Sequence, residues 1–254
     1  MCLTCRGNGF YVPDLPLGDP AFGRAKRCRQ CQPDYAAHCG LTTEELTYTV
    51  DTIEGKNEIA VTLRHLVRTI CDQPTGWLTL YGDSGSAKTL AIQAIIATLV
   101  RNGAIARFAH AHQVEQAWLA DRDDDKSNAV FFLNAPILAL DELDKTNLKN
   151  DWVRQQFQYL LDHRYRQAVA GNQLTLITLQ FAPEKTLPND MVSRMNDGRF
   201  YRPWPYAKNA LTVNRWGQTA LPGLLHVQGP DARPYVAPSF AKAQKKVSRG
   251  VQGQ

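Results

Sequence analysis

Short apolar runs alternate with amphipathic segments over the middle of the chain, from about residue 57 to residue 179. Four runs have the length of buried strands, namely 77–81, 104–109, 136–140 and 174–179. Four segments have the apolar spacing or the continuous apolar character of helices, namely 57–71, 90–100, 113–119 and 152–165. Strands that alternate with helices predict an α/β domain in three layers, with a central, mostly parallel sheet covered by helices on both faces.

The two ends of the chain have a different pattern. Residues 1–40 hold five of the six cysteines with many Gly and Pro and no sustained apolar periodicity, which is typical of a small metal-stapled unit. The pattern changes at Leu41. There Thr42 or Thr43, which stand ahead of two glutamates, predict the capped start of a helix. Beyond about residue 222, Gly, Pro and basic residues follow no clear pattern. We expect a module at 1–40, the α/β domain at 41–221 and a basic, extended or partly disordered tail at 222–254.

Composition adds limits on the environment of the protein. The chain is 44% apolar and 21% charged, and no apolar run approaches the roughly 18 residues of a membrane span. The first residues lack the pattern of a secretory signal, so we expect a cytoplasmic protein with reduced thiols and no membrane partner. The net charge of +5 is concentrated partly in 24–29 and 242–249. Such clusters either neutralise nucleic-acid phosphates or form a solvated surface, and charge alone does not decide between the two.

A glycine-bearing loop lies between the run 77–81 and the helical segment 90–100. Strand, loop and helix in this order match the phosphate-binding pattern G-x-x-x-x-G-K-[ST] at all fixed positions but one. Backbone amides of the loop would surround a triphosphate, the lysine would contact the outer phosphates, and the threonine hydroxyl would bind Mg²⁺. The candidate nucleotide-binding residues are Gly82, Asp83, Ser84, Gly85, Ser86, Ala87, Lys88 and Thr89.

Ala87 is the departure from this pattern, because it stands where the second glycine is expected. Its methyl group lies where backbone approaches phosphate, and alanine disfavours a positive φ. The substitution therefore predicts weaker nucleotide binding without forbidding it. A chance glycine-serine turn before a lysine is the alternative interpretation of the loop.

About fifty residues after the loop, the acidic pair Asp141-Glu142 directly follows the apolar run 136–140. Ligands of open α/β sheets collect at the carboxyl ends of strands, so we expect the pair to face the loop from the adjoining strand. Asp141 would hold Mg²⁺ through water, and Glu142 would orient the attacking water as general base. An acidic pair alone also occurs in solvated turns, but the two signals together indicate an ATPase.

The order of these elements resembles the AAA+ helicase loaders of bacteria and phages, of the DnaC and DnaI type, with the IstB transposition ATPases as close relatives. The likeness covers roughly residues 40–205 and rests on the loop with its strand (78–82), the acidic strand (138–142), Leu161-Asp-His-Arg-Tyr165 and the strand 174–178. The resemblance implies the AAA+ fold, ATP and Mg²⁺ as ligands, and assembly of several copies when ATP is bound.

Further site residues are implied by the resemblance. Gln180 takes the place of the polar sensor that contacts the γ-phosphate or the lytic water, with Thr178 behind it. Arg194, in Met191-Val-Ser-Arg-Met195, corresponds to the arginine that acts on a neighbouring protomer's nucleotide; a surface arginine is the alternative. Arg199 and Arg202 are both candidates for a second sensor, and their spacing does not select between them.

Two Cys-x-x-Cys pairs lie in the first 31 residues, with 22 residues between them. Cys2, Cys5, Cys28 and Cys31 have the number and arrangement of a four-thiolate Zn²⁺ site, which would fold the module but leave no open position for catalysis. Cys39 and His38 are alternatives for one of the ligands; otherwise Cys39 is a free or buried thiol. By resemblance, the module would dock on a replicative helicase.

The sequence thus predicts an ATP-dependent loader that places a ring-shaped, DnaB-type helicase on single-stranded DNA. Two alternatives stay open: an IstB-type transposition ATPase, and a DNA-binding adaptor whose phosphate loop is degenerate at Ala87. Near the end of the domain, Trp204 and Tyr206 would stack on bases or pack on their own domain.

Overall fold

A five-stranded sheet forms the centre of the protein. The computed structural model describes residues 2–4, 10–14, 16, 22, 26–28, 38–55, 57–121, 129–200, 202–203, 220–221 and 223–228. The strands are β3 (Gly76–Tyr81), β4 (Ala106–His110), β5 (Ile137–Asp141), β6 (Leu174–Leu179) and β9 (Leu224–His226). They lie in the order β4-β5-β6-β3-β9, and every neighbouring pair is parallel. The carboxyl ends of all five strands therefore meet at one edge.

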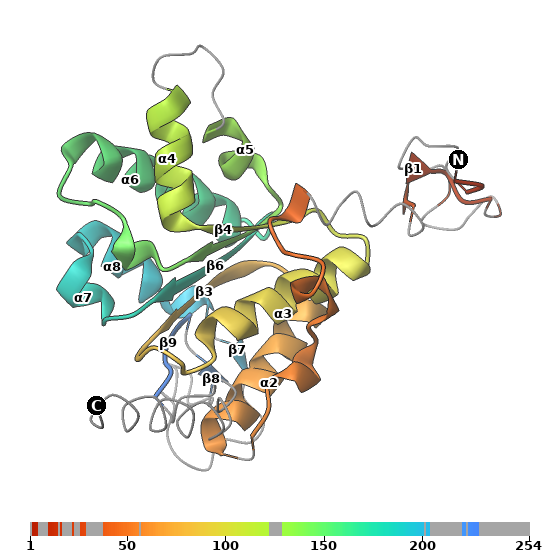
Figure 1. The fold of residues 1–254 in the computed structure, drawn as a ribbon, viewed down its shortest axis with the longest axis horizontal. Coiled ribbons are helices and arrows are strands. Elements are labelled where there is room, and N and C mark those ends of the chain that lie inside the picture. The colour runs from red at the N-terminus through yellow and green to blue at the C-terminus, as the bar shows by residue number, and fades with distance from the viewer. Residues whose placement is uncertain are drawn as a thin grey trace, which may run out of the picture.

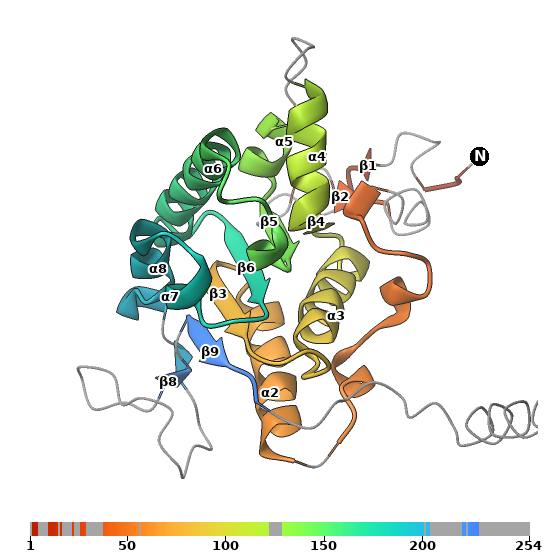
Figure 2. The ribbon, with the colours of Figure 1, turned by 60° about the vertical axis from the view of Figure 1, so that its left-hand side comes forward.

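Helices cover both faces of this sheet, which gives three layers (Figure 1). One side carries α2 (Glu58–Asp72) and α3 (Lys88–Arg101), with the short turns η2 (Glu45–Thr47) and η3 (Val50–Thr52) beside them. The opposite side carries α4 (Ala111–Asp121), α5 (Ala129–Asn134), α6 (Asp151–Val169), α7 (Pro183–Thr186) and α8 (Asn189–Met195). The turned view separates the same two groups of helices (Figure 2). The expected three-layer α/β architecture is confirmed.

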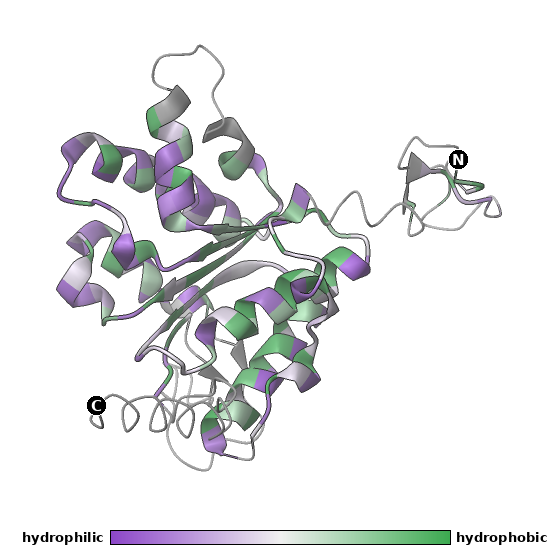
Figure 3. Cartoon of the chain, in the orientation of Figure 1, coloured by the Kyte–Doolittle hydropathy of each residue, from purple (hydrophilic) through white to green (hydrophobic). Residues whose placement is uncertain are grey.

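Two hydrophobic cores, one on each face, hold the layers together. Leu78 and Leu80 of β3 pack toward α2 and α3, while Trp77 of the same strand packs toward α6 and α8. Alternate side chains of a strand point to opposite faces, so a strand buried on both faces is apolar nearly throughout. Figure 3 shows this pattern, with apolar colour along the strands and hydrophilic colour on much of α4 and α6.

Most elements expected in the α/β domain are present, and several others were missed. The helix start expected after Leu41 is only a short turn, although Thr42 and Glu45 do form the expected reciprocal cap. Not predicted were α5, α7, α8 and the turns η4 (Leu143–Lys145) and η5 (Gly198–Phe200). Two small antiparallel pairs, β1 (Phe10–Tyr11) with β2 (Lys26–Arg27) and β7 (Arg202–Pro203) with β8 (Ala220–Leu221), were also missed.

The sheet extends past the expected domain boundary at residue 221. Strand β9 pairs with β3 from Leu224 to His226, so this part of the expected tail belongs to the α/β domain. At the other boundary, Cys39 lies in the core beside α3, only 3% exposed. Residues 229–254, with the basic cluster at 242–249, lie outside the described residues, as do Arg24 and Arg29.

None of the helices in the described part of the chain combines the length and the apolar character that crossing a bilayer requires.

Candidate functional site

The loop between β3 and α3 has the backbone of a tight turn around a small cavity. Gly82 has φ 140°, and a Cβ there would meet the carbonyl oxygen of Val227 at 2.2 Å, so the residue that follows β9 restricts this position to glycine. The cavity has a volume of about 370 Å³ and is lined by residues 84–89 of the loop, by the acidic pair's glutamate and by residues 178–180 at the end of β6. Its lining residues are Ser84, Gly85, Ser86, Ala87, Lys88, Thr89, Leu90, Gln93, Glu142, Thr178, Leu179 and Gln180.

Ala87, the residue in place of the second glycine, has a left-handed backbone with φ 64° and ψ 17°. This conformation costs an alanine roughly 1–2 kcal/mol because its Cβ approaches the following carbonyl. The structure therefore keeps the backbone that a glycine would adopt there and places the strain on a single methyl-bearing residue. Ala87 is also the N-cap of α3, where it makes no side-chain cap.

Lys88 is 8% exposed and folds back over its own loop. Its ammonium donates to the carbonyl oxygens of Gly82 and Asp83, each at 2.7 Å, and to Ser86 Oγ at 3.1 Å. Burial lowers the pKa of this ammonium, and the nearby carboxylates, first of all Asp141, act in the opposite direction. Lys88 thus lies between the loop and the acidic strand end, at the wall of the cavity.

Asp141 is the buried centre of the site, with 1% of its surface exposed. Its Oδ1 accepts a hydrogen bond from Thr89 Oγ1 at 2.9 Å and another from Thr178 Oγ1 at 2.5 Å. Burial raises the pKa of the Asp141 carboxyl, and the two threonine hydroxyls and the imidazole of His110 oppose that rise. Because Thr89 uses its proton on Asp141, its oxygen lone pairs are left for a cation, which fits the donor set of a Mg²⁺ site.

The acidic strand does not adjoin the strand that enters the loop, contrary to the expectation from the sequence. Strand β6 lies between β3 and β5, with Thr178 opposite Leu80 of β3. The Thr178 hydroxyl spans the gap, because it donates to Asp141 and also accepts from the backbone N–H of Glu142 at 2.9 Å. The sequence placed Thr178 behind the sensor, whereas the structure places it in direct contact with both members of the acidic pair.

Glu142 has the other left-handed backbone of a non-glycine residue among the described residues, with φ 56°. Its carboxylate lines the cavity and pairs through Oε1 with Lys145 Nζ at 2.5 Å. Strain of this kind collects at functional sites, where surrounding contacts hold it in place. Here the bond from Glu142 N–H to Thr178 supplies such a contact.

The end of β6 is held to the acidic strand by a second carboxylate, Asp144. Its Oδ2 accepts from the backbone N–H groups of Gln180 at 2.8 Å and Phe181 at 3.0 Å. Gln180, the candidate sensor, thereby lies on the wall of the cavity.

The candidate arginines lie away from the cavity. Arg194, on α8, forms ion pairs with Asp162 and, at 3.3 Å, with Asp190. Arg199 is bound by Asp197 Oδ2 and by the Tyr165 hydroxyl, each at 2.6 Å. Within one chain, therefore, neither guanidinium lines the cavity beside the loop. Arg202 belongs to β7, and Trp204 and Tyr206 lie outside the described residues.

One member of each cysteine pair is described. Cys2 Sγ and Cys28 Sγ are 3.3 Å apart, so the two halves of the motif come together. Cys5 and Cys31 lie outside the described residues. Burial raises the pKa of the Cys39 thiol, and this cysteine packs in the core of the α/β domain as a buried thiol.

His110 is one of the site residues that sequence reasoning missed, as are Asp144 and Lys145. It ends β4 opposite Asp141 in the sheet register, and its Nδ1 lies 3.1 Å from Asp141 Oδ2. The signal was its position at the end of an apolar strand, which becomes informative only once the strand order is known.

Comparison with protein-family models finds no match, and neither does comparison with curated protein sequences. Among solved structures, AMPPCP-bound DnaA from Aquifex aeolicus is similar with a TM-score of 0.53 at 16% identity, over 80% of this chain and 55% of that one. DnaI is similar with a TM-score of 0.53 at 14% identity, over 76% of this chain and 94% of that one. The DnaC helicase loader is similar with a TM-score of 0.50 at 22% identity, over 60% of this chain and 94% of that one.

The chain thus spans about half the length of the matched DnaA chain and nearly all of the DnaI and DnaC chains. At these identities the similarity concerns the fold. The chain therefore shares its fold with the matched DnaA, DnaC and DnaI chains.

Proposed function

We propose that this protein is an ATPase that loads a ring-shaped replicative helicase of the DnaB type onto single-stranded DNA during replication initiation. The observation that carries the ATPase assignment is the hydrogen bond from Thr89 to Asp141, at 2.9 Å, beside a cavity that also contains Lys88 and Glu142. This hydrogen bond joins the loop to the acidic pair, which lies 52 positions later in the chain.

The loop, the acidic pair and Gln180 have distinct parts in this proposal. The amides of residues 82–87 and the Lys88 ammonium bind the phosphates, and Thr89 and Asp141 hold Mg²⁺. When bound, Mg²⁺ neutralises charge that develops on the phosphates. Glu142 takes the proton of the attacking water, which requires that its carboxylate leave Lys145. Gln180 contacts the outer phosphate or the water from the end of β6.

Steady-state ATP hydrolysis tests this assignment, with the wild type compared with Lys88→Ala and Glu142→Gln. We expect turnover by the wild type and a rate at background in both variants. Equal and negligible rates in all three proteins would instead favour the second candidate, a DNA-binding adaptor with a degenerate loop. The left-handed Ala87 is the observation that favours this second candidate.

Helicase loading is supported by the similarity to DnaI and to the DnaC helicase loader, each matched over 94% of its own chain. Single-stranded DNA as a partner is supported by the similarity to a structure of the replication initiator DnaA bound to AMPPCP and single-stranded DNA, with a TM-score of 0.52 at 17% identity over 80% of this chain and 55% of that one. The third candidate, an IstB-type ATPase, would instead form ATP-dependent filaments on duplex DNA.

The N-terminal module is proposed to hold Zn²⁺ through Cys2, Cys5, Cys28 and Cys31 and to dock on the helicase. The 3.3 Å between Cys2 Sγ and Cys28 Sγ supports this, because Zn–S bonds of about 2.3 Å place tetrahedral sulfurs about 3.8 Å apart. A pull-down against the cognate helicase, with zinc content measured in parallel, compares Cys28→Ser with the matched control Cys71→Ser. We expect loss of zinc and of binding only in Cys28→Ser; retained binding in that variant contradicts the docking role.

Arg194 is proposed to act on the nucleotide of a neighbouring copy after leaving its ion pairs with Asp162 and Asp190. Mixing two inactive variants tests this directly. An Arg194→Ala protomer keeps its own Glu142, and a Glu142→Gln neighbour supplies the missing arginine, so the mixture should regain hydrolysis. If the mixture stays inactive although it assembles, Arg194 does not act between copies.

A further inference from the structure

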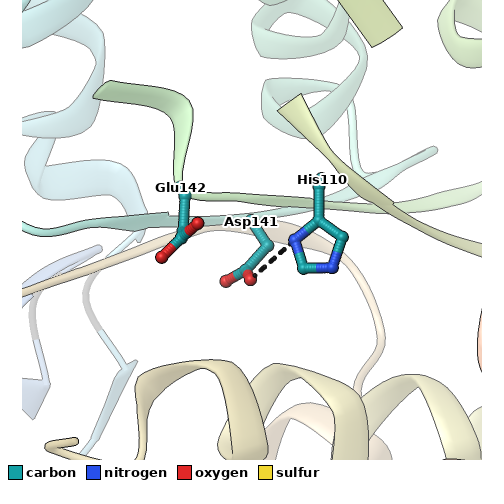
Figure 4. A group of neighbouring side chains, drawn as sticks. All are labelled: His110, Asp141 and Glu142. Carbon is teal, nitrogen blue, oxygen red and sulfur yellow. Dashed lines mark ion pairs between the residues drawn. The ribbon is translucent and has the colours of Figure 1, made fainter. Parts of the chain in front are cut away.

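A cluster of three possible metal ligands lies beside the nucleotide cavity. One ligand atom each from His110, Asp141 and Glu142 lies within 4.8 Å of the others. Figure 4 shows the three side chains pointing to the same side from the ends of two neighbouring strands, with Asp141 in the middle. The three side chains therefore lie together at the carboxyl ends of β4 and β5.

The backbone explains how two consecutive residues and a third from another strand point together. His110 and Asp141 are register partners in a parallel pair, so their side chains share a face of the sheet. Consecutive residues of a strand normally point to opposite faces. The left-handed conformation of Glu142, φ 56° and ψ 50°, ends that alternation and places its carboxylate beside that of Asp141.

The contact between His110 and Asp141 lacks the geometry of a hydrogen bond. Nδ1 lies 3.1 Å from Asp141 Oδ2, yet it is buried and has no hydrogen-bond partner among the described residues. The imidazole nitrogen and the carboxylate oxygen are both donor atoms for a cation. Their separation of 3.1 Å matches the roughly 3 Å between adjacent ligands around an octahedral ion with bonds of about 2.1 Å.

The other carboxylate oxygen of Asp141 has a different set of neighbours. Oδ1 already accepts the hydroxyl protons of Thr89 and Thr178, whereas Oδ2 faces the imidazole. The two oxygens thus face two separate positions, one on the Thr89 side and one on the His110 side. One carboxylate oxygen of Glu142 lies within 4.8 Å of the ligand atoms of His110 and Asp141, and Lys145 engages Glu142 Oε1.

We propose that His110, Asp141 and Glu142 form a binding site for a divalent transition-metal ion, separate from the Mg²⁺ position at Thr89. One imidazole and two carboxylates favour such an ion over Mg²⁺, because imidazole nitrogen suits transition metals and Mg²⁺ prefers oxygen. Mn²⁺ accepts the mixed set, and its binding displaces Lys145 from Glu142. The site exists without nucleotide, so it does not depend on the ATPase assignment.

Mn²⁺ alone is the suitable probe, because it binds weakly to cysteine thiolates, which prefer Zn²⁺. The full chain, zinc-loaded and free of nucleotide, is titrated with Mn²⁺ in millimolar Mg²⁺ and followed by electron paramagnetic resonance. We expect one bound Mn²⁺ per chain with nitrogen coupling from one imidazole in the pulsed spectrum. His110→Gln should abolish the nitrogen coupling and weaken Mn²⁺ binding at least about tenfold.

Two further variants keep the result interpretable. His163→Gln, on α6, should leave both the affinity and the nitrogen coupling unchanged. Glu142→Gln should weaken Mn²⁺ binding while the nitrogen coupling stays. This variant replaces His110→Gln as the test if circular dichroism shows that His110→Gln is unfolded. Bound Mn²⁺ without nitrogen coupling in the wild type, or unchanged coupling in His110→Gln, overturns the proposal. Mg²⁺-nucleotide binding is measured separately, so failure of the ATPase assignment is distinguishable.

Discussion

The phosphate loop and the end of β5 each contain one non-glycine residue with a left-handed backbone, and the two residues are supported very differently. Ala87 in the loop offers only a methyl group and no side-chain cap. Glu142 is held by Thr178 at its backbone and by Lys145 at its carboxylate. The strain at Glu142 brings a carboxylate to the cavity, whereas the strain at Ala87 brings nothing that glycine would not supply. Strain therefore indicates function only where the strained residue's own side chain is used.

The largest expected effect follows from removing the charge at Glu142 while its size is kept. Glu142→Gln should lower the rate of ATP hydrolysis by about a hundredfold or more, because proton transfer by a positioned base contributes about 10²–10⁴. Nucleotide binding should persist, since Lys88 and Asp141 are untouched. Single-turnover hydrolysis measures the rate, and Glu184→Gln on exposed α7 is the matched control. Unchanged hydrolysis in Glu142→Gln would mean that this strained carboxylate is not the base.

An intermediate effect is expected at Thr178, which supports the acidic strand end from β6. Thr178→Val keeps the shape but removes the hydrogen bonds to Asp141 and from Glu142 N–H. A hydrogen bond to a charged group is worth about 1.5–3 kcal/mol, so Mg²⁺-ATP binding should weaken about tenfold or more.

The same variant should change the pH dependence of Mg²⁺-ATP binding. Burial already raises the pKa of Asp141, and Thr178 opposes that rise. Mg²⁺ needs the ionised carboxylate, so binding is present above this pKa and lost as pH falls through it. Thr178→Val removes a lowering influence, so the loss should begin at higher pH than in the wild type. Calorimetric titrations between pH 5 and 8 measure this, and an acid limb unmoved by the substitution would argue against the role of Thr178.

The smallest effect is the gain in stability that is expected from relieving the backbone strain. Ala87→Gly and Glu142→Gly should each raise the free energy of unfolding by about 1 kcal/mol or less, because glycine adopts a positive φ without steric cost. Only Ala87→Gly should also strengthen nucleotide binding, by several-fold, while Glu142→Gly should lose hydrolysis. Urea denaturation and nucleotide titration measure the two quantities. A fall in stability on Ala87→Gly would contradict the strain at this position.

The contrast between the two regions also separates what the sequence predicts from what it does not. Lys88, Thr89 and Asp141 follow from local patterns, a loop between strand and helix and a carboxylate at a strand end, and the structure brings them together. The role of Thr178 depends on β6 lying between β3 and β5. Strand order is a property of long-range pairing that no local pattern encodes.

His110 and β9 were missed for the same kind of reason. His110 is a single residue that gains its meaning from pairing with Asp141 on another strand. Strand β9 has three residues and lies 45 positions after β6, in a segment without periodicity, yet Val227 beside it fixes the position of Gly82. Contacts of this kind appear only when the whole sheet is assembled.

Calorimetric titration with AMPPCP, with and without Mg²⁺, tests the central claim that the loop and the acidic strand end enclose a Mg²⁺-bound triphosphate. The wild type should bind about one nucleotide per chain with Mg²⁺-dependent affinity. Lys88→Ala should weaken binding in both conditions, and Asp141→Asn should weaken it only when Mg²⁺ is present. If the wild type and both variants bind equally, or if none binds, the cavity is not a nucleotide site and the account is contradicted.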